Sequence, residues 1–236
     1  MVAIFKRDFR AYFTSPLGYV FIAAFVLVCN INFWLTNILG VSADLGFVFN
    51  FMSFLLIFTV PILTMRLFSE EMKQKTDQLL LTSPVKVLDV VIGKFLAAMG
   101  VFAVAIAFTL IYLLVIAMFQ GQPNIRAVLG NYMGVFFLSS AFIAIGLFLS
   151  SLTENQLISC ITSLVAFLAL YLLDSTASAF ASNPVVYAIL NAISIFRRYN
   201  NLYNGVLSLA DMVFYVSVAG VFLFLTTRVI ERKRWS

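Results

Sequence analysis

The chain has 236 residues, of which 63% are apolar and 11% are charged, and its mean hydropathy is +1.05. About a quarter of the residues of a soluble domain are charged, so this composition excludes a soluble protein and indicates a membrane protein. A bilayer is crossed by about 20 helical residues, and the length therefore fits roughly six spans with short loops. The formal net charge of +5 is explained by membrane orientation and gives no reason to expect nucleic-acid binding.

The 15 Lys and Arg residues fall mainly in alternate gaps between the apolar runs. Twelve of them lie before the first run, between the second and third runs, or after the last run. The remaining three are Arg126, Arg197 and Arg198. Because basic residues near membrane spans are retained in the cytoplasm, this pattern predicts an even number of spans with both termini cytoplasmic.

The first predicted element, residues 3–14, is an amphipathic helix lying in the cytoplasmic interface. Aromatic side chains such as Phe9 share one face, and Lys6, Arg7 and Arg10 occupy the other. Asp8 borders the aromatic face and is the one position that does not fit the pattern. The helix is expected to end at Ser15-Pro16, since proline disfavours a helical conformation in the residue before it.

Six apolar stretches follow that are long enough to cross a membrane. They are residues 17–39, 45–65, 95–119, 127–150, 155–173 and 207–227. In the turn between the fourth and fifth stretches, Ser151 and Glu154 have the spacing of a capping box, which predicts that a helix starts there at once. Residues 174–204 are too polar to span and are broken by Pro184, so external re-entrant or interfacial helices are expected. The sequence shows no repeat or linker, and we expect residues 1–236 to form a single membrane domain.

Several kinds of chemistry are missing from the sequence. The chain has no histidine, no cysteine or carboxylate cluster with metal-ligand spacing, and no glycine-rich phosphate loop. We therefore expect no catalytic residue, no metal site and no cofactor site in this chain, and we do not expect it to be an enzyme. No charged residue lies near the middle of a predicted span, which argues against a proton- or ion-coupled carrier.

The segment between the second and third spans carries the strongest functional signal. A charged start that includes Glu70 and Glu71 is followed by a leucine cluster at 79–81 and a stop at Thr82-Ser83-Pro84. An amphipathic helix of this kind is suited to a groove on a soluble partner. An ordinary solvated loop fits the spacing equally well.

Residues 66–95 resemble the signature of ABC-2-type transporter permeases. The residues that match the family's pattern are Arg66, Phe68, Glu70, Glu71, Thr76, Leu79, Leu80, Pro84, Gly93 and Lys94. Lys75 departs from it, since the family usually has glycine there. Residues 13–20 and 146–156 also resemble the family's entry into the first span and its tight turn between the fourth and fifth spans. Residues 203–211 are similar to the branch that includes gliding-motility-associated permeases.

The resemblance implies the permease subunit of an ATP-binding cassette exporter in the bacterial inner membrane. Its coupling helix would involve Glu70, Glu71, Thr76, Leu79, Leu80 and Pro84, and Glu154 in the turn between spans four and five would form a smaller contact. The implied partners are two copies of a separate ATPase that binds ATP and Mg²⁺, a second permease subunit of the same or a related chain, and membrane lipid. An ATP-independent channel or carrier, and a motility or assembly subunit that acts as a mechanical relay, are the alternatives.

Overall fold

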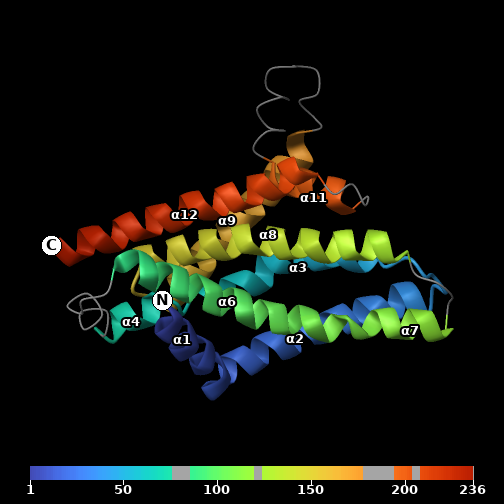
Figure 1. Ribbon diagram of the computed structural model, residues 1–236, viewed down its shortest axis with the longest axis horizontal. Coiled ribbons are helices and arrows are strands. Elements are labelled where there is room, and N and C mark those ends of the chain that lie inside the picture. Colours follow the sequence, from blue (N-terminus) through green and yellow to red (C-terminus); the bar gives the residue numbers. More distant parts are fainter. Residues whose placement is uncertain (76–85, 120–123, 178–193, 204–207, 236) are drawn as a thin grey trace.

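The computed structural model describes residues 1–75, 86–119, 124–177, 194–203 and 208–235, and within these ranges all regular structure is helical (Figure 1). Six helical segments are long and apolar enough to cross a membrane: Pro16–Ile38, Gly46–Lys73, Val87–Met118, Ile125–Leu152, Gln156–Asp174 and Leu209–Lys233. The predicted all-α polytopic membrane fold with six spans is confirmed.

Most of the spans are built from one long helix. The bounds are α2 Pro16–Phe33, continued by the π-helical turn η1 Trp34–Ile38, then α3 Gly46–Thr64, α6 Val87–Thr109 followed by α7 Ile111–Phe119, α8 Ile125–Leu152, α9 Gln156–Ala177 and α12 Leu209–Trp235. The prediction that the third span begins at residue 95 was wrong, since α6 already begins at Val87. The sequence predicted a separate helix that leads to Lys94 before this span, whereas in the structure Lys94 lies inside α6 and its ammonium group is paired with Glu71.

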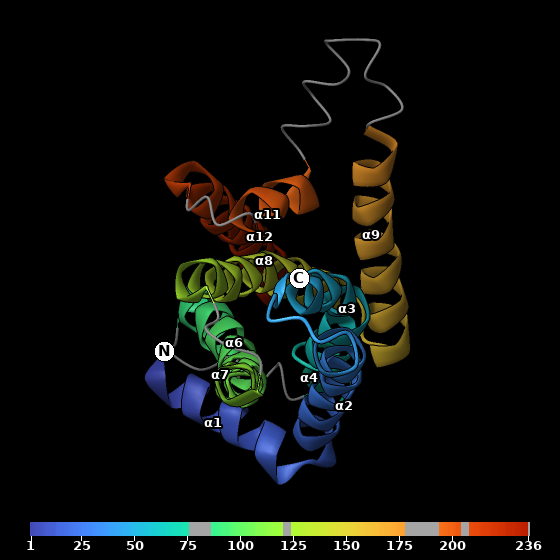
Figure 2. The ribbon, with the colours of Figure 1, turned by 90° about the vertical axis from the view of Figure 1, so that its right-hand side faces the viewer.

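Helix α8 lies at the centre of the bundle and contacts α3, α6, α9, α11 and α12. Figure 2 shows most of the spans end-on, whereas α9 runs across the view. Helix α9 therefore crosses the other spans at a steep angle, and several of its large apolar side chains, including Leu157, Ile161 and Val165, are exposed. This exposed face is available to lipid or to another membrane helix.

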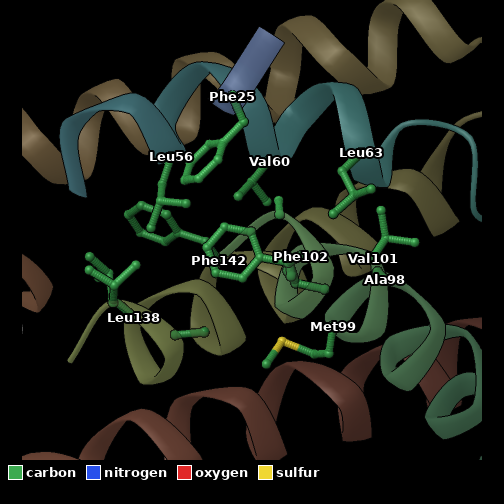
Figure 3. Packing of buried hydrophobic residues seen from close by; sticks show 14 of the residues in the cluster. Phe25, Leu56, Val60, Leu63, Ala98, Met99, Val101, Phe102, Leu138 and Phe142 are labelled. Atoms are coloured by element: carbon green, nitrogen blue, oxygen red, sulfur yellow. The ribbon is translucent and has the colours of Figure 1, made fainter. Parts of the chain in front are cut away.

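Aromatic and branched side chains from four helices form the core of the bundle (Figure 3). Phe25 of α2 lies between Leu56 and Val60 of α3, and its ring centroid is 5.6 Å from that of Phe102 on α6. Phe142 contributes from α8 and is completely buried. In a bilayer such packing, rather than escape from water, is what holds the helices together.

The structure brings the start of α1 (Val2–Thr14), the end of α3, the start of α6 and the end of α12 to one end of the bundle (Figure 1). We call it the basic end, because the twelve basic residues of the alternate gaps belong to these segments and to the loop between α3 and α6. The predicted helix over residues 3–14 is confirmed, and it ends as expected before Pro16. Its face containing Asp8 and Tyr12 is buried, because α1 packs against α6.

The opposite end, which we call the far end, carries the short helix α11 (Ile195–Tyr203). The hydroxyl of Tyr199 donates a hydrogen bond to the carbonyl oxygen of Phe49 over 2.9 Å, and Arg198 forms an ion pair with Asp211 over 3.2 Å. These contacts fix α11 to α3 and α12, so the predicted helix before the last span is present. The rest of that prediction, residues 178–193, lies outside the described residues.

Candidate functional site

A short helix at the basic end, α4 (Ser69–Lys73), follows α3 after the turn at 65–68. No local side chain caps its first turn. Instead Ser150 of α8 supplies the cap: its hydroxyl oxygen accepts hydrogen bonds from the backbone N–H groups of Phe68 (3.2 Å) and Ser69 (3.3 Å). The Ser69 hydroxyl in turn donates to the Ser150 carbonyl oxygen over 3.1 Å. Because helix N-termini need acceptors for their free N–H groups, this exchange fastens α4 to α8.

Four charged side chains form a closed ring between α1, α4 and α6, which we call the charge ring. The carboxylate of Glu71 lies 2.7 Å from Arg7 Nη2 and 2.9 Å from Lys94 Nζ. The carboxylate of Asp8 lies 2.7 Å from Arg7 Nε and 3.3 Å from Lys94 Nζ. Each acid thus bridges both cations, and the ring joins one residue of α4, two of α1 and one of α6.

Lys94 is the most deeply buried member of the charge ring, with 2% of its surface exposed. Its ammonium group also donates a 2.7 Å hydrogen bond to the carbonyl oxygen of Leu67, in the turn before α4. The ring of Phe68 lies 5.1 Å from the same nitrogen and adds a cation–π contact. A buried charge is tolerated only when it is fully paired, and these contacts supply the pairing.

Two pKa shifts at the N-terminal helix follow from this arrangement. Partial burial lowers the pKa of the Arg7 guanidinium, but the hydrogen bonds and charges of Asp8 and Glu71 outweigh that effect and raise the pKa above its ordinary value. Complete burial, together with the charge of Asp8, raises the pKa of the Tyr12 hydroxyl. Tyr12 therefore stays neutral and donates a 2.7 Å hydrogen bond to the Leu63 carbonyl oxygen, a second link from α1 to the end of α3.

A pocket of about 360 Å³ opens over the charge ring. Its wall also includes a second ion pair, formed by Arg66 and Glu70 four residues apart. Three basic and three acidic side chains thus line the pocket, and each is paired within it. The pocket therefore lies at a junction of α1, α4 and α6 whose charges are matched within the chain.

The last helix also reaches α4. The ammonium group of Lys233, near the end of α12, lies 2.9 Å from the Ser151 carbonyl oxygen and 2.9 Å from the sulfur of Met72. A cation is favourable beside the free carbonyl groups at the end of a helix such as α8. Helix α4 is therefore bonded to α1, α6, α8 and α12 together.

The structure describes three of the seven residues predicted for the coupling site. Glu70 and Glu71 both lie on α4, where they take part in ion pairs within the chain. Glu154 is exposed in the turn at 153–155, directly after the residues of α8 that contact α4. Thr76, Leu79, Leu80 and Pro84 lie outside the described residues.

The predicted capping box at Ser151 was wrong. Ser151 still belongs to α8, and its hydroxyl donates to the Phe148 carbonyl oxygen within that helix. Asn155 precedes α9 instead, and its side-chain oxygen accepts the N–H of Leu157 over 2.9 Å, which is the geometry of a helix cap. Asparagine is as good a cap as serine, so the capping-box spacing alone could not distinguish Asn155 from Ser151.

The chain matches the family model described as ABC-2 family transporter protein over residues 35–233. The chain belongs to the ABC-2 transporter family. The match covers most of the chain and includes α4, α6, α8 and α12, so four of the helices that meet at the basic end belong to the family's membrane domain. Comparison with curated proteins found no match. The similarity to the gliding-motility branch stays a prediction.

Sequence reasoning did not identify several residues of this ABC-2 site, above all Asp8, Ser150 and Lys233. Asp8 gave a signal, because an acid on the buried face of an amphipathic helix needs a cation nearby. Lys94 was matched to the family pattern, but its partners were not foreseen. Ser150 and Lys233 gave no signal, since their contacts join residues more than 80 positions apart.

Proposed function

We propose that this chain is the permease subunit of an ATP-binding cassette exporter, driven by a separate ATPase. The observation that supports the proposal is the bonding of α4, a five-residue helix at the basic end, to four other helices. With these anchors, a movement of this short helix would be passed on to the helices that it contacts. An ATPase that moved α4 would move α1, α6, α8 and α12 with it.

The charge ring also determines how the coupling segment is held. Residues 76–85 lie between Glu71 and Lys94 in the sequence, and the ion pair between these two side chains closes the base of that segment. A force applied to residues 76–85 would therefore reach α4 and α6 at once. We propose that Thr76, Leu79, Leu80 and Pro84 contact the ATPase, and that Glu154 contributes a smaller contact nearby.

The same proposal assigns the remaining partners. Two ATPase copies would bind ATP and Mg²⁺, and a second permease subunit, identical or related, would complete the membrane part. Residues 1–236 would form one transmembrane domain, because α1, which precedes the family match, is tied into it by Asp8 and Arg7. The basic end would face the cytoplasm of a bacterial cell and the far end the outside, as the distribution of Lys and Arg predicts.

The test is purification of the tagged chain from its native membrane, with the ATPase as the readout. Glu154→Lys is the useful variant, because Glu154 is exposed and its charge reversal would oppose a docked partner. Like charges at an interface cost several kcal/mol, so the ATPase should be retained by the wild type and lost from the variant. Arg126→Glu reverses an exposed charge at the far end and should retain the ATPase. Absence of any ATPase from the wild-type complex would contradict the proposal and favour a channel or carrier.

The alternative of a motility or assembly subunit predicts the same ATPase contact. It differs in the consequence of ATP hydrolysis, since a mechanical relay moves a partner protein and exports nothing. A transport assay in vesicles reconstituted with the complex distinguishes the two alternatives. ATP-dependent accumulation of a compound from a cell extract supports the exporter, and hydrolysis without any accumulation supports the relay.

A further inference from the structure

An apolar groove of about 640 Å³ runs along the outer surface of α2 beside α6, away from the charge ring. Its wall includes Phe13, Tyr19, Ala23, Leu27, Val104 and Phe108, and it continues as far as Ile31. From Tyr19 to Ile31 the helix advances about 18 Å at 1.5 Å per residue. Half of a bilayer's hydrocarbon core is about 15 Å thick, so the groove has the length of one acyl chain in one leaflet.

Helix α1 contributes Phe13 to the wall of the groove and carries two exposed cations, Lys6 and Arg10. Lys6 lies three residues before Phe9 and Arg10 three residues before Phe13, so these four side chains form a stripe along the border between the aromatic face and the basic face of α1. The aromatic rings of the stripe continue into the groove, with 5.0 Å between the centroids of Phe9 and Phe13 and 5.8 Å from Phe13 to Tyr19. Basic groups therefore lie where an apolar channel meets the membrane surface.

The charges of this stripe are not used by the protein itself. Arg7 belongs to the charge ring, whereas Lys6 and Arg10 have no hydrogen-bond or ion-pair partner in the part of the chain that the structure describes. The acid nearest in sequence, Asp8, lies on the buried face of α1 and is bridged by Arg7 and Lys94. An anion from outside the chain is the natural partner for both cations.

We propose that the groove binds one anionic phospholipid of the leaflet at the basic end. An acyl chain would lie along Tyr19, Ala23 and Leu27, and the headgroup phosphate would lie between Lys6 and Arg10. A basic amphipathic helix at an interface has this combination of apolar and electrostatic attraction. Each cation near an anionic surface favours binding by about fivefold, and the two together by about 30-fold.

The test uses the full-length chain in nanodiscs of equal parts phosphatidylglycerol and phosphatidylcholine, followed by transfer to mild detergent and native mass spectrometry. The wild type should retain one phosphatidylglycerol per chain. Lys6→Gln with Arg10→Gln should lower that retention by tenfold or more. Lys86→Gln with Arg232→Gln removes two other exposed cations of the basic end and should leave retention unchanged.

A second variant tests the groove independently of charge. Ala23→Phe fills the channel, keeps both cations, and should also release the lipid. Equal retention of phosphatidylcholine, or equal loss of phosphatidylglycerol from both double variants, would overturn the proposal. So would displacement by inorganic phosphate alone, which would indicate an anion site without an acyl chain. Efficient disulfide formation between two Leu27→Cys chains lacking Cys29 and Cys160 would also overturn it, because a second copy would then cover the groove.

Discussion

Glu71 Oε2 lies 2.9 Å from Lys94 Nζ, and this pair joins α4 to α6 on the two sides of the predicted coupling segment. Lys94 is almost completely buried, whereas Glu71 is partly accessible at the surface of the bundle. The pair therefore connects a partly buried helix at the end of the bundle to the interior of a membrane span. An exposed ion pair alone would contribute little, but here removal of one partner takes an opposite charge away from a buried group, which is costly.

Lys94→Gln should destabilise the protein by about 3 kcal/mol, since breaking a buried ion pair by removing one partner typically has that effect. Asp8 and Glu71 would then face one another with Arg7 as their remaining shared cation. Thermal unfolding of the purified chain in detergent measures the change. Lys86→Gln, at an exposed position just before α6, is the control and should unfold like the wild type. Equal stability of the two variants would contradict the pairing.

Ser150→Ala should destabilise the chain by about 1–2 kcal/mol, because the N–H groups of Phe68 and Ser69 lose their acceptor. Hydrogen exchange of residues 68–72 should become faster, as α4 is released from α8. Ser217→Ala is a matched control, since in the part of the chain that the structure describes its exposed hydroxyl bonds only the Val213 carbonyl oxygen of its own helix. Unchanged exchange in Ser150→Ala would show that the cap is unimportant.

Gly146→Ala should destabilise the bundle by about 1–3 kcal/mol through overpacking. A β-carbon at residue 146 would lie 2.3 Å from Thr64 Oγ1 and 2.9 Å from Thr64 Cβ, so α8 and α3 would have to separate. Gly220→Ala adds the same atom where nothing lies within 4 Å. Unfolding in a denaturant series compares them, and a harmless Gly146→Ala would show that the two helices are not so close.

The orientation is tested by cysteine labelling in a background without Cys29 and Cys160. Cysteines at Lys75 and Asn124 lie at exposed positions of the basic end and the far end. In intact cells an impermeant reagent should label the cysteine at 124 and should reach the one at 75 only after permeabilisation. The reverse pattern would place the basic end outside.

The spans could be predicted from sequence because about 20 consecutive apolar residues have few other uses. The continuity of α6 through Lys94 could not, since the pairing of this charge depends on side chains of α1 and α4. Asp8 is a second example. Its position on the helix predicted an acid on the buried face, but the cation that neutralises it, Lys94, is far away in the sequence and could not be identified.

Part of the candidate site was predicted, but from a family resemblance and not from the contacts of its side chains. Glu70 and Glu71 were chosen through the resemblance to ABC-2 permeases, which assigns the region but not the contacts of each side chain. The structure shows that Glu71 is bonded within the chain, so Glu71→Lys would break the charge ring as well as change the surface. Glu154 forms no ion pair in the part of the chain that the structure describes, so a change at this residue tests docking more directly.

The central claim, that α4 transmits ATP-driven movement into the membrane, is tested most directly by Glu71→Gln. This change removes the ion pairs of α4 with Lys94 of α6 and with Arg7 of α1, and it leaves the Asp8–Lys94 pair in place. The readout is the labelling rate of a cysteine at residue 124, at the far end, in the reconstituted complex with and without ATP. Glu231→Gln, which removes a partly exposed acid paired with Arg228 on the same helix, is the control.

We expect ATP to change the labelling rate in the wild type and in Glu231→Gln. Glu71→Gln should retain the ATPase and hydrolyse ATP, yet its labelling rate should no longer respond. A Glu71→Gln complex whose far end responds to ATP as the wild type does would contradict the account.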